Sequence, residues 1–176
     1  MKDKGIVYNR INDLLSSNDI VIVSVDGRCG SGKTTLASEI REHFRCTVYH
    51  MDDYYLPLGS RDPGWKQIPA GNMDLQRFLS EVLLRIRNGG TDWGLDRLYV
   101  VEGSYSQHPL LASMYDLKVF LTCDADTQAA RLRKRERDNY VNFRNIWIPM
   151  EENYFRTFDI EEKSDIVINA DELVPV

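Results

Sequence analysis

Two kinds of hydrophobic pattern alternate along the chain. Short runs of β-branched and other apolar residues, with apolar side chains on both faces, predict buried strands. Longer stretches in which apolar residues recur every three or four positions predict amphipathic helices. The expected strands cover residues 20–25, 47–51, 98–101, 117–122 and 165–169. The expected helices cover residues 5–17, 34–44, 75–86, 125–138 and 150–158.

The alternation of strands and helices favours one fold class. Parallel strands need long crossover connections, which are usually helices. The pattern therefore predicts an α/β fold in which a five-stranded parallel sheet is covered by helices on both faces. A chain of 176 residues fits a single domain over residues 1–176, because domains commonly contain about 100–200 residues. The polar stretch 52–72 reads as a long loop, and long loops inside compact domains are usually functional.

The segment that joins the first strand to the next helix matches the phosphate-loop pattern G-x-x-x-x-G-K-[ST]. Its glycines let the backbone curl so that N–H groups point at phosphate oxygens, and the helix N-terminus adds positive potential. Lys33 is expected to contact the β and γ phosphates, and the Thr34 hydroxyl to bind Mg²⁺. ATP and Mg²⁺ are therefore the expected cofactors. The expected nucleotide-binding residues are Gly27, Arg28, Cys29, Gly30, Ser31, Gly32, Lys33, Thr34 and Thr35.

Two classes of nucleotide-binding protein fit this sequence poorly. A GTPase would carry the guanine-reading pattern N-K-x-D, which the sequence lacks. A motor or AAA-type ATPase would need a longer chain and usually an acidic pair after the third strand. This chain has the single Glu102 at that position. A kinase is therefore the favoured class.

Carboxylates follow two of the expected strands. Asp52 and Asp53 come after the second strand, and Glu102 ends the third. Because the C-terminal ends of parallel strands face the ligand crevice, these groups are expected to converge near the γ-phosphate. Glu102 can hold Mg²⁺ directly or through water. A kinase also needs a base for the attacking hydroxyl, and Asp52 or Asp53 fits that role.

Four arginines occupy alternate positions from Arg131 to Arg137. On a helix, Arg131 and Arg135 share one face because they are four residues apart. That face is expected to close over the triphosphate as a lid, at about residues 125–145, and to stabilise developing charge. The alternative is an ordinary solvated helix.

Composition narrows the range of partners. The chain has 22 Lys and Arg against 27 Asp and Glu, for a net charge of −5. A general nucleic-acid surface or an anionic-membrane surface is therefore disfavoured. The longest apolar runs are too short to span a membrane, and the N-terminus does not look like a secretory signal. Three cysteines without paired spacing agree with a reduced, cytoplasmic chain.

Together these residues resemble the uridine kinase-like branch of phosphate-loop kinases, which includes uridine, phosphoribulose and nicotinamide riboside kinases. The matching segments are residues 26–37, 51–55, 71–74, 100–103, 115–121 and 131–138. The resemblance implies ATP-dependent phosphoryl transfer to a small-molecule hydroxyl, with Asp52 as the catalytic base and Glu102 as the Mg²⁺-linked carboxylate. It places Asp74 where uridine kinases grip the ribose hydroxyls, and it places Arg131 and Arg135 in an arginine-bearing lid.

The acceptor zone around residues 52–77 is rich in carboxylates, namely Asp52, Asp53, Asp62 and Asp74. These groups repel a phosphorylated acceptor but accept hydrogen bonds from hydroxyls. A nucleoside, sugar or vitamin-like alcohol is therefore favoured, with Asp53, Tyr54 and Asp74 as substrate-binding residues. Tyr54, Tyr55, Trp65 and Trp93 could form flat walls for a ring, or could simply pack the long loop.

The sequence departs from uridine kinases at two places. Residues 68–73 replace the Asp-His-Pro that precedes the ribose-binding Asp in that family. Residues 88–97 are too few for the hairpin that holds uracil there. The acceptor's identity therefore stays open. Two alternatives also remain: a nucleoside monophosphate kinase that uses Arg61 and Lys66 as a phosphate clamp, and a non-catalytic nucleotide-binding module.

Overall fold

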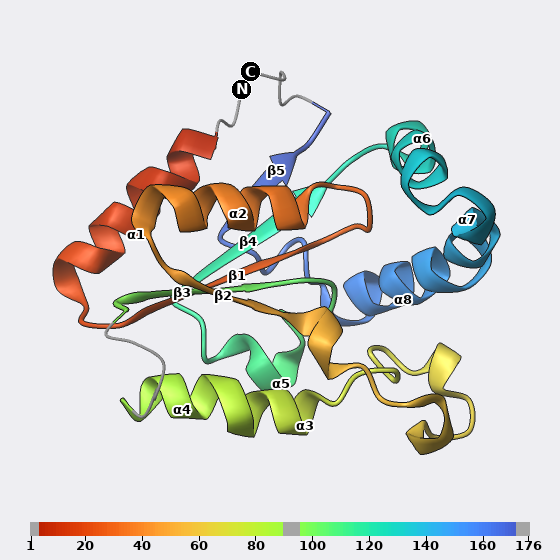
Figure 1. Cartoon of the computed structure of the whole chain (residues 1–176), viewed down its shortest axis with the longest axis horizontal. Coiled ribbons are helices and arrows are strands. Elements are labelled where there is room, and N and C mark those ends of the chain that lie inside the picture. The colour runs from red at the N-terminus through yellow and green to blue at the C-terminus, as the bar shows by residue number, and fades with distance from the viewer. Residues whose placement is uncertain (1–3, 90–95, 172–176) are drawn as a thin grey trace.

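A computed structural model of the chain describes residues 4–89 and 96–171. Trp93 and most of the segment 88–97 lie outside the described residues. Within them, a five-stranded sheet has the order β2-β3-β1-β4-β5, and every pairing is parallel. This confirms the predicted sheet (Figure 1). The strands are β1 (Val21–Gly27), β2 (Thr47–His50), β3 (Leu98–Glu102), β4 (Leu117–Thr122) and β5 (Ile166–Asn169).

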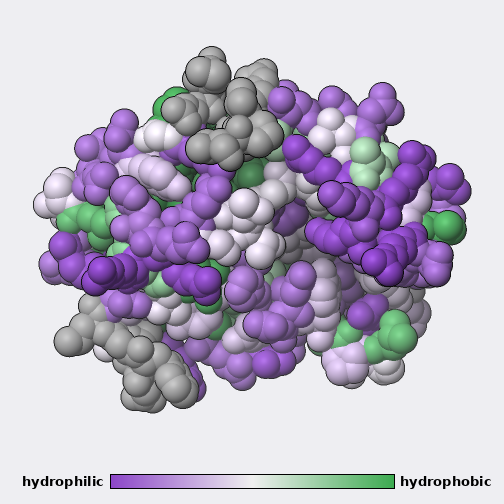
Figure 2. Space-filling model, turned by 45° about the horizontal axis from the view of Figure 1, so that its top comes forward, coloured by the Kyte–Doolittle hydropathy of each residue, from purple (hydrophilic) through white to green (hydrophobic). Residues whose placement is uncertain are grey.

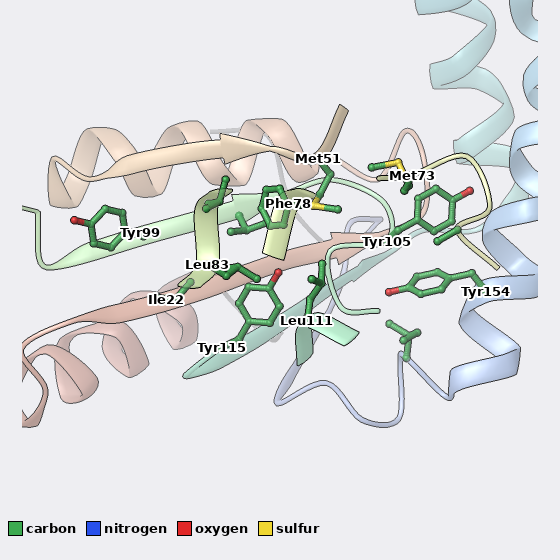
Figure 3. Close-up of a cluster of buried hydrophobic side chains, with 14 of the residues drawn as sticks. Ile22, Met51, Met73, Phe78, Leu83, Tyr99, Tyr105, Leu111, Tyr115 and Tyr154 are labelled. Atoms are coloured by element: carbon green, nitrogen blue, oxygen red, sulfur yellow. The ribbon is translucent and has the colours of Figure 1, made fainter. Parts of the chain in front are cut away.

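Helices cover both faces of the sheet, as the doubly apolar strand pattern requires. On one face, α1 (Lys4–Ser17) and α2 (Lys33–Phe44) bury Val7, Ile11, Leu36 and Ile40 against the strands. On the other face lie α3 (Leu75–Phe78), α4 (Leu84–Arg87), the short α5 (Pro109–Ala112) and α8 (Ile148–Phe158). Figure 3 shows this second core, with Phe78, Leu83 and Leu111 among its side chains.

The helices differ from the predicted ones in their continuity. A π turn (Leu79–Leu83) interrupts the predicted helix 75–86 between α3 and α4. The gap expected between residues 138 and 150 is mostly helical. After α6 (Ala125–Glu136) come a 3₁₀ turn (Arg137–Asn139), α7 (Tyr140–Asn142) and a second π turn (Phe143–Trp147), which leads into α8. Figure 2 shows that hydrophilic residues cover much of the molecule on the side of α6 and α7.

The long loop contains three 3₁₀ turns: Met51–Tyr54, Leu58–Ser60 and Trp65–Gln67. An extended strand continuing through Asp52 and Asp53 would point their side chains to opposite faces. The first turn replaces that extended backbone, so alternation cannot separate the directions of the two side chains. None of the described helices is both long and apolar enough to cross a membrane.

Strand order places the site. β1 lies between β3 and β4, and the chain crosses to the far side of β1 only after β3 is complete. The C-terminal end of β1, where the phosphate loop begins, is therefore the point at which the winding direction reverses. Ligands of open α/β sheets bind at such a point.

Candidate active site

A cavity of about 910 Å³ lies at the C-terminal end of the sheet. Its walls come from the phosphate loop, the turn after β2, the loop after β3 and the segment from α6 to α8. Segments far apart in sequence therefore meet around one hollow of a size typical for small-molecule sites.

The phosphate loop has the backbone that its glycines allow. Gly27 has φ 138°, and a Cβ at this position would lie 2.0 Å from the carbonyl oxygen of Leu121, so only glycine fits here. The Lys33 ammonium donates to the carbonyl oxygens of Gly27 (2.7 Å) and Arg28 (3.1 Å). Cys29 to Thr35 line the cavity. The loop therefore presents its backbone and Lys33 to the hollow, as phosphate binding requires.

Arg28 behaves differently from the rest of the loop. Its guanidinium donates to Glu152 Oε1 (2.8 Å) and Thr122 Oγ1 (2.6 Å), and it lies 5.7 Å from the centre of the Phe155 ring. The side chain is absent from the residues that line the cavity. Through these contacts, the Arg28 side chain connects the start of the phosphate loop to helix α8.

Thr34 and Glu102 meet at the floor of the cavity. The Thr34 hydroxyl lies 3.3 Å from Glu102 Oε2, and His50 Nδ1 lies 2.5 Å from Oε1 of the same carboxylate. Glu102 is only 6% exposed. No group of three or more His, Cys, Asp or Glu side chains within residues 4–89 and 96–171 could hold a metal. A hydroxyl and one carboxylate nevertheless fit Mg²⁺, which usually takes its other ligands from water and substrate phosphates.

The structure separates Asp52 from the other expected acceptor residues. Asp52 lines the cavity, whereas Asp53, Tyr54 and Asp74 do not. The Tyr54 ring packs edge-on against Phe78, with the ring centres 4.9 Å apart. The Asp74 side chain accepts a hydrogen bond from the amide of Arg77 and so caps the N-terminus of α3. In this structure these three residues therefore lie outside the cavity lining.

Residues of the expected lid face the cavity in a regular row. Arg131 and Arg135 both line it, and the Arg131 guanidinium donates to the carbonyl of Gly30 (3.2 Å). The row continues at intervals of four residues through Asn139, Phe143, Trp147 and Glu151. A π turn takes more residues per turn than an α-helix, so the turn at Phe143–Trp147 helps to keep this spacing in line. The arginine run shows only the beginning of the row.

Glu151 is the functional candidate that the sequence does not single out. The residue is 5% exposed. Its Oε2 accepts from the amide of Cys29 (2.9 Å), and its Oε1 accepts from the Ser104 hydroxyl (2.5 Å). It also lines the cavity. Only the four-residue repeat that begins at Arg131 and reaches position 151 could have pointed to it.

Aromatic and charged side chains also line the cavity. The aromatic ones include Tyr55, Tyr105, Phe143 and Trp147. Arg61 lines it too, but its guanidinium donates to the carbonyl of Leu56 (2.9 Å) and lies 4.3 Å from the Trp65 ring centre. Lys66 lies outside the cavity lining, 5.6 Å from the centre of the same ring. The pair Arg61 and Lys66 therefore does not form a two-cation clamp here.

Comparison with solved structures shows the same fold in small-molecule kinases. A possible uridine kinase from Bacillus stearothermophilus is 18% identical, with a TM-score of 0.64, and the match covers 92% of this chain and 98% of that one. D-glycerate 3-kinase from Cryptococcus neoformans var. grubii is 13% identical, with a TM-score of 0.63, and the match covers 98% of this chain and 96% of that one. No curated protein matches the sequence.

The protein family that matches is described as an AAA domain, and the match covers residues 23–170. The family carries the AAA description although the short chain and the single Glu102 differ from what a motor or AAA-type ATPase would need. The match includes the phosphate loop, Glu102 and the expected lid. The chain therefore belongs to this AAA domain family, and its fold is that of the uridine kinase-like phosphate-loop kinases.

Proposed function

We propose that the protein is an ATP-dependent kinase that transfers the γ-phosphoryl group to a hydroxyl of a small uncharged molecule, with a nucleoside-like acceptor favoured. One observation carries the proposal. The phosphate loop, the Thr34–Glu102 pair, Asp52 and two lid arginines all face a single cavity. The fold neighbours include proteins described as a possible uridine kinase and a D-glycerate 3-kinase, which supports a small-molecule acceptor.

Each group has a role in this proposal. The amides of the loop and Lys33 bind the triphosphate, and Thr34 and Glu102 would hold Mg²⁺, which would neutralise phosphate charge when bound. Asp52 takes the proton of the attacking hydroxyl. Arg131 and Arg135 stabilise the charge that develops on the transferred group. Catalysis then consists mostly of positioning and electrostatic stabilisation.

The competing functions have less support. A nucleoside monophosphate kinase needs cations around the acceptor phosphate, and Arg61 is already engaged with Leu56 and Trp65. A nucleotide-binding module without transfer activity needs neither Asp52 nor an acceptor space. A cytoplasmic setting belongs to the same proposal, and the free, buried thiols of Cys29, Cys46 and Cys123 support it.

Asp52→Asn tests the proposal. Asn keeps the shape of the side chain but cannot act as a base, so turnover should fall by roughly 10²–10⁴-fold. MgATP affinity should stay equal or tighten slightly, because one negative charge near the triphosphate is removed. Transfer from MgATP to a panel of nucleosides and sugar alcohols, together with calorimetric MgATP binding, measures both effects.

Asp53→Asn is the matched control, since Asp53 is exposed and lies outside the cavity lining. We expect it to keep near-normal turnover. If Asp53→Asn were slow and Asp52→Asn active, the base would be Asp53, and the assignment to Asp52 would be wrong. Transfer by the wild type to no compound in the panel would favour the binding module.

A further inference from the structure

A buried carboxylate sits at the junction of the phosphate site and the acceptor end. Glu151 Oε2 accepts from the amide of Cys29, one residue beyond the carbonyl of Arg28 to which the Lys33 ammonium donates. Burial raises the pKa of the Cys29 thiol, and the charge of Glu151 raises it further, whereas Lys33 and Arg135 lower it. Glu151 therefore lies beside the cations that bind the end of the triphosphate.

The same carboxylate also borders the acceptor end. Burial raises the pKa of the Tyr105 phenol, and the charge of Glu151 raises it further. Although 41% of Tyr55 is exposed, burial raises the pKa of its phenol as well, followed by the charges of Asp52 and Glu151. Both carboxylates thus act on one aromatic wall, so an acceptor that reaches Asp52 also lies within range of Glu151.

Within residues 4–89 and 96–171, no Lys, Arg or His side chain forms a direct ion pair with Glu151. Its hydrogen-bond partners there include the amide of Cys29, the thiol of Cys29 and the hydroxyl of Ser104, and all three are uncharged. Its neighbour Glu152 differs, because its carboxylate pairs with Arg28 and does not line the cavity. An unpaired buried carboxylate repels a nearby anion strongly, since the interior screens charges poorly.

We propose that Glu151 determines acceptor specificity: its carboxylate excludes acceptors that carry a phosphate or carboxylate group near the reacting hydroxyl. Hydroxyl compounds without such a group are admitted, because a hydroxyl can donate to a carboxylate. Discrimination of this kind places a repulsive group against the wrong ligand rather than a new attraction for the right one. The inference rests on the proposed kinase function and names the residue that restricts its acceptor class.

Two matched pairs of acceptors test the specificity: uridine with uridine 5′-monophosphate, and glycerol with D-glycerate. For each pair, the ratio of kcat/KM for the neutral member to that for the anionic member is measured with MgATP. We expect Glu151→Gln to lower this ratio about tenfold or more. Glu152→Gln removes the same charge one residue further along the helix and should leave the ratio close to that of the wild type. An unchanged ratio in Glu151→Gln overturns the proposal.

A nucleotide-binding measurement tests the repulsion by Glu151 without any acceptor. In this proposal the γ-phosphate, which ADP lacks, is an anion that binds close to Glu151. We expect Glu151→Gln to strengthen MgATP binding relative to MgADP binding by about threefold or more, with no such change in Glu152→Gln. If the wild type phosphorylates none of the four compounds, the kinase proposal loses its support and the acceptor role of Glu151 falls with it, whereas an unchanged MgATP-to-MgADP ratio in Glu151→Gln overturns the repulsion by Glu151 while leaving the kinase proposal in place.

Two further outcomes are decisive. Loss of transfer to the neutral acceptors by about 10²-fold in Glu151→Gln, with loss of the acidic limb of the pH profile, would make Glu151 the base and overturn the proposal. If Glu151→Gln does not fold, Glu151→Met provides a second uncharged side chain of similar size. Ser104→Ala keeps the charge of Glu151 and removes one hydrogen bond, so it should retain the neutral-to-anionic ratio of the wild type.

Discussion

Asp26 lies one residue before Gly27 at the end of β1 and has no exposed surface. Its carboxylate accepts from the amides of Gly27 (2.7 Å) and Gln107 (3.0 Å) and from the Tyr154 hydroxyl (2.8 Å). Burial raises its pKa to about 6, although these hydrogen bonds and the Lys33 ammonium act to lower it. The folded protein therefore holds this proton more tightly than an unfolded chain, in which the pKa is 3.8.

Asp26 should make stability depend on pH in a defined window. Its contribution is fully present below the unfolded pKa of 3.8 and is lost as the pH rises through about 6. A shift of about two units corresponds to roughly 3 kcal/mol. We expect the free energy of unfolding of the wild type, relative to Asp26→Asn, to fall by an amount of this order across that window. Urea unfolding in small pH steps measures it, with exposed Asp53→Asn as a control that should show no such trend. Parallel curves for wild type and Asp26→Asn would refute the assignment.

Individual residues were predictable where a local motif fixes their chemistry. Lys33 and Thr34 follow from the loop pattern alone, and the structure places both in the cavity. Asp52 and Asp53 could not be separated from sequence, because the tight turn Met51–Tyr54 replaces the extended backbone that alternation assumes. Glu151 could not be found because its neighbours Cys29 and Ser104 reach it only through the tertiary fold.

At the scale of elements, the segment from α6 to the second π turn runs along the cavity from the phosphate loop to Trp147. Arg131 contacts the carbonyl of Gly30, and Trp147 lies 5.9 Å from Trp65, measured between ring centres. The helical path changes type at the 3₁₀ turn Arg137–Asn139 and at the π turn Phe143–Trp147. Such irregular turns recur at functional sites and hinges. The same turns explain why sequence patterns, which assume one uniform helical period, did not predict the helical segment between residues 138 and 150.

This segment should respond to nucleotide as one unit. An arginine lid must open for nucleotide exchange and close to exclude water. We expect amide hydrogen exchange in residues 125–147 to slow by about tenfold or more when MgATP saturates the protein. Helix α4, behind the sheet, provides the internal control and should change little. Equal exchange of residues 125–147 with and without MgATP would favour a solvated helix that takes no part in closure.

At the scale of the whole molecule, the hydrophobic pattern predicted the layers well because burial on both faces leaves a clear signal. β1 is buried at each of its residues, and helices of both layers pack against it. The fold delivers the ends of β1, β2 and β3 to one edge, where the phosphate loop, Asp52 and Glu102 meet. Pattern alone could not show how the segment from α6 to α8 closes that edge, since this depends on contacts such as Arg28 with Glu152.

Because the site is assembled from segments across the whole chain, nucleotide should stabilise the entire fold. A ligand that binds only the native state at 100 times its Kd adds about 2.7 kcal/mol. In a chain of 176 residues this corresponds to a rise in Tm of roughly 5–10 °C.

Lys33→Ala should lose most of that rise. Its ligand-free Tm should stay within about 2 °C of the wild type, because the hydrogen bonds that the Lys33 ammonium makes to the described residues go to loop carbonyls at the cavity wall. Thermal unfolding of both proteins over a range of MgATP concentrations gives the comparison. Equal shifts in wild type and Lys33→Ala would mean that MgATP binds elsewhere, and the phosphate-loop assignment would fail.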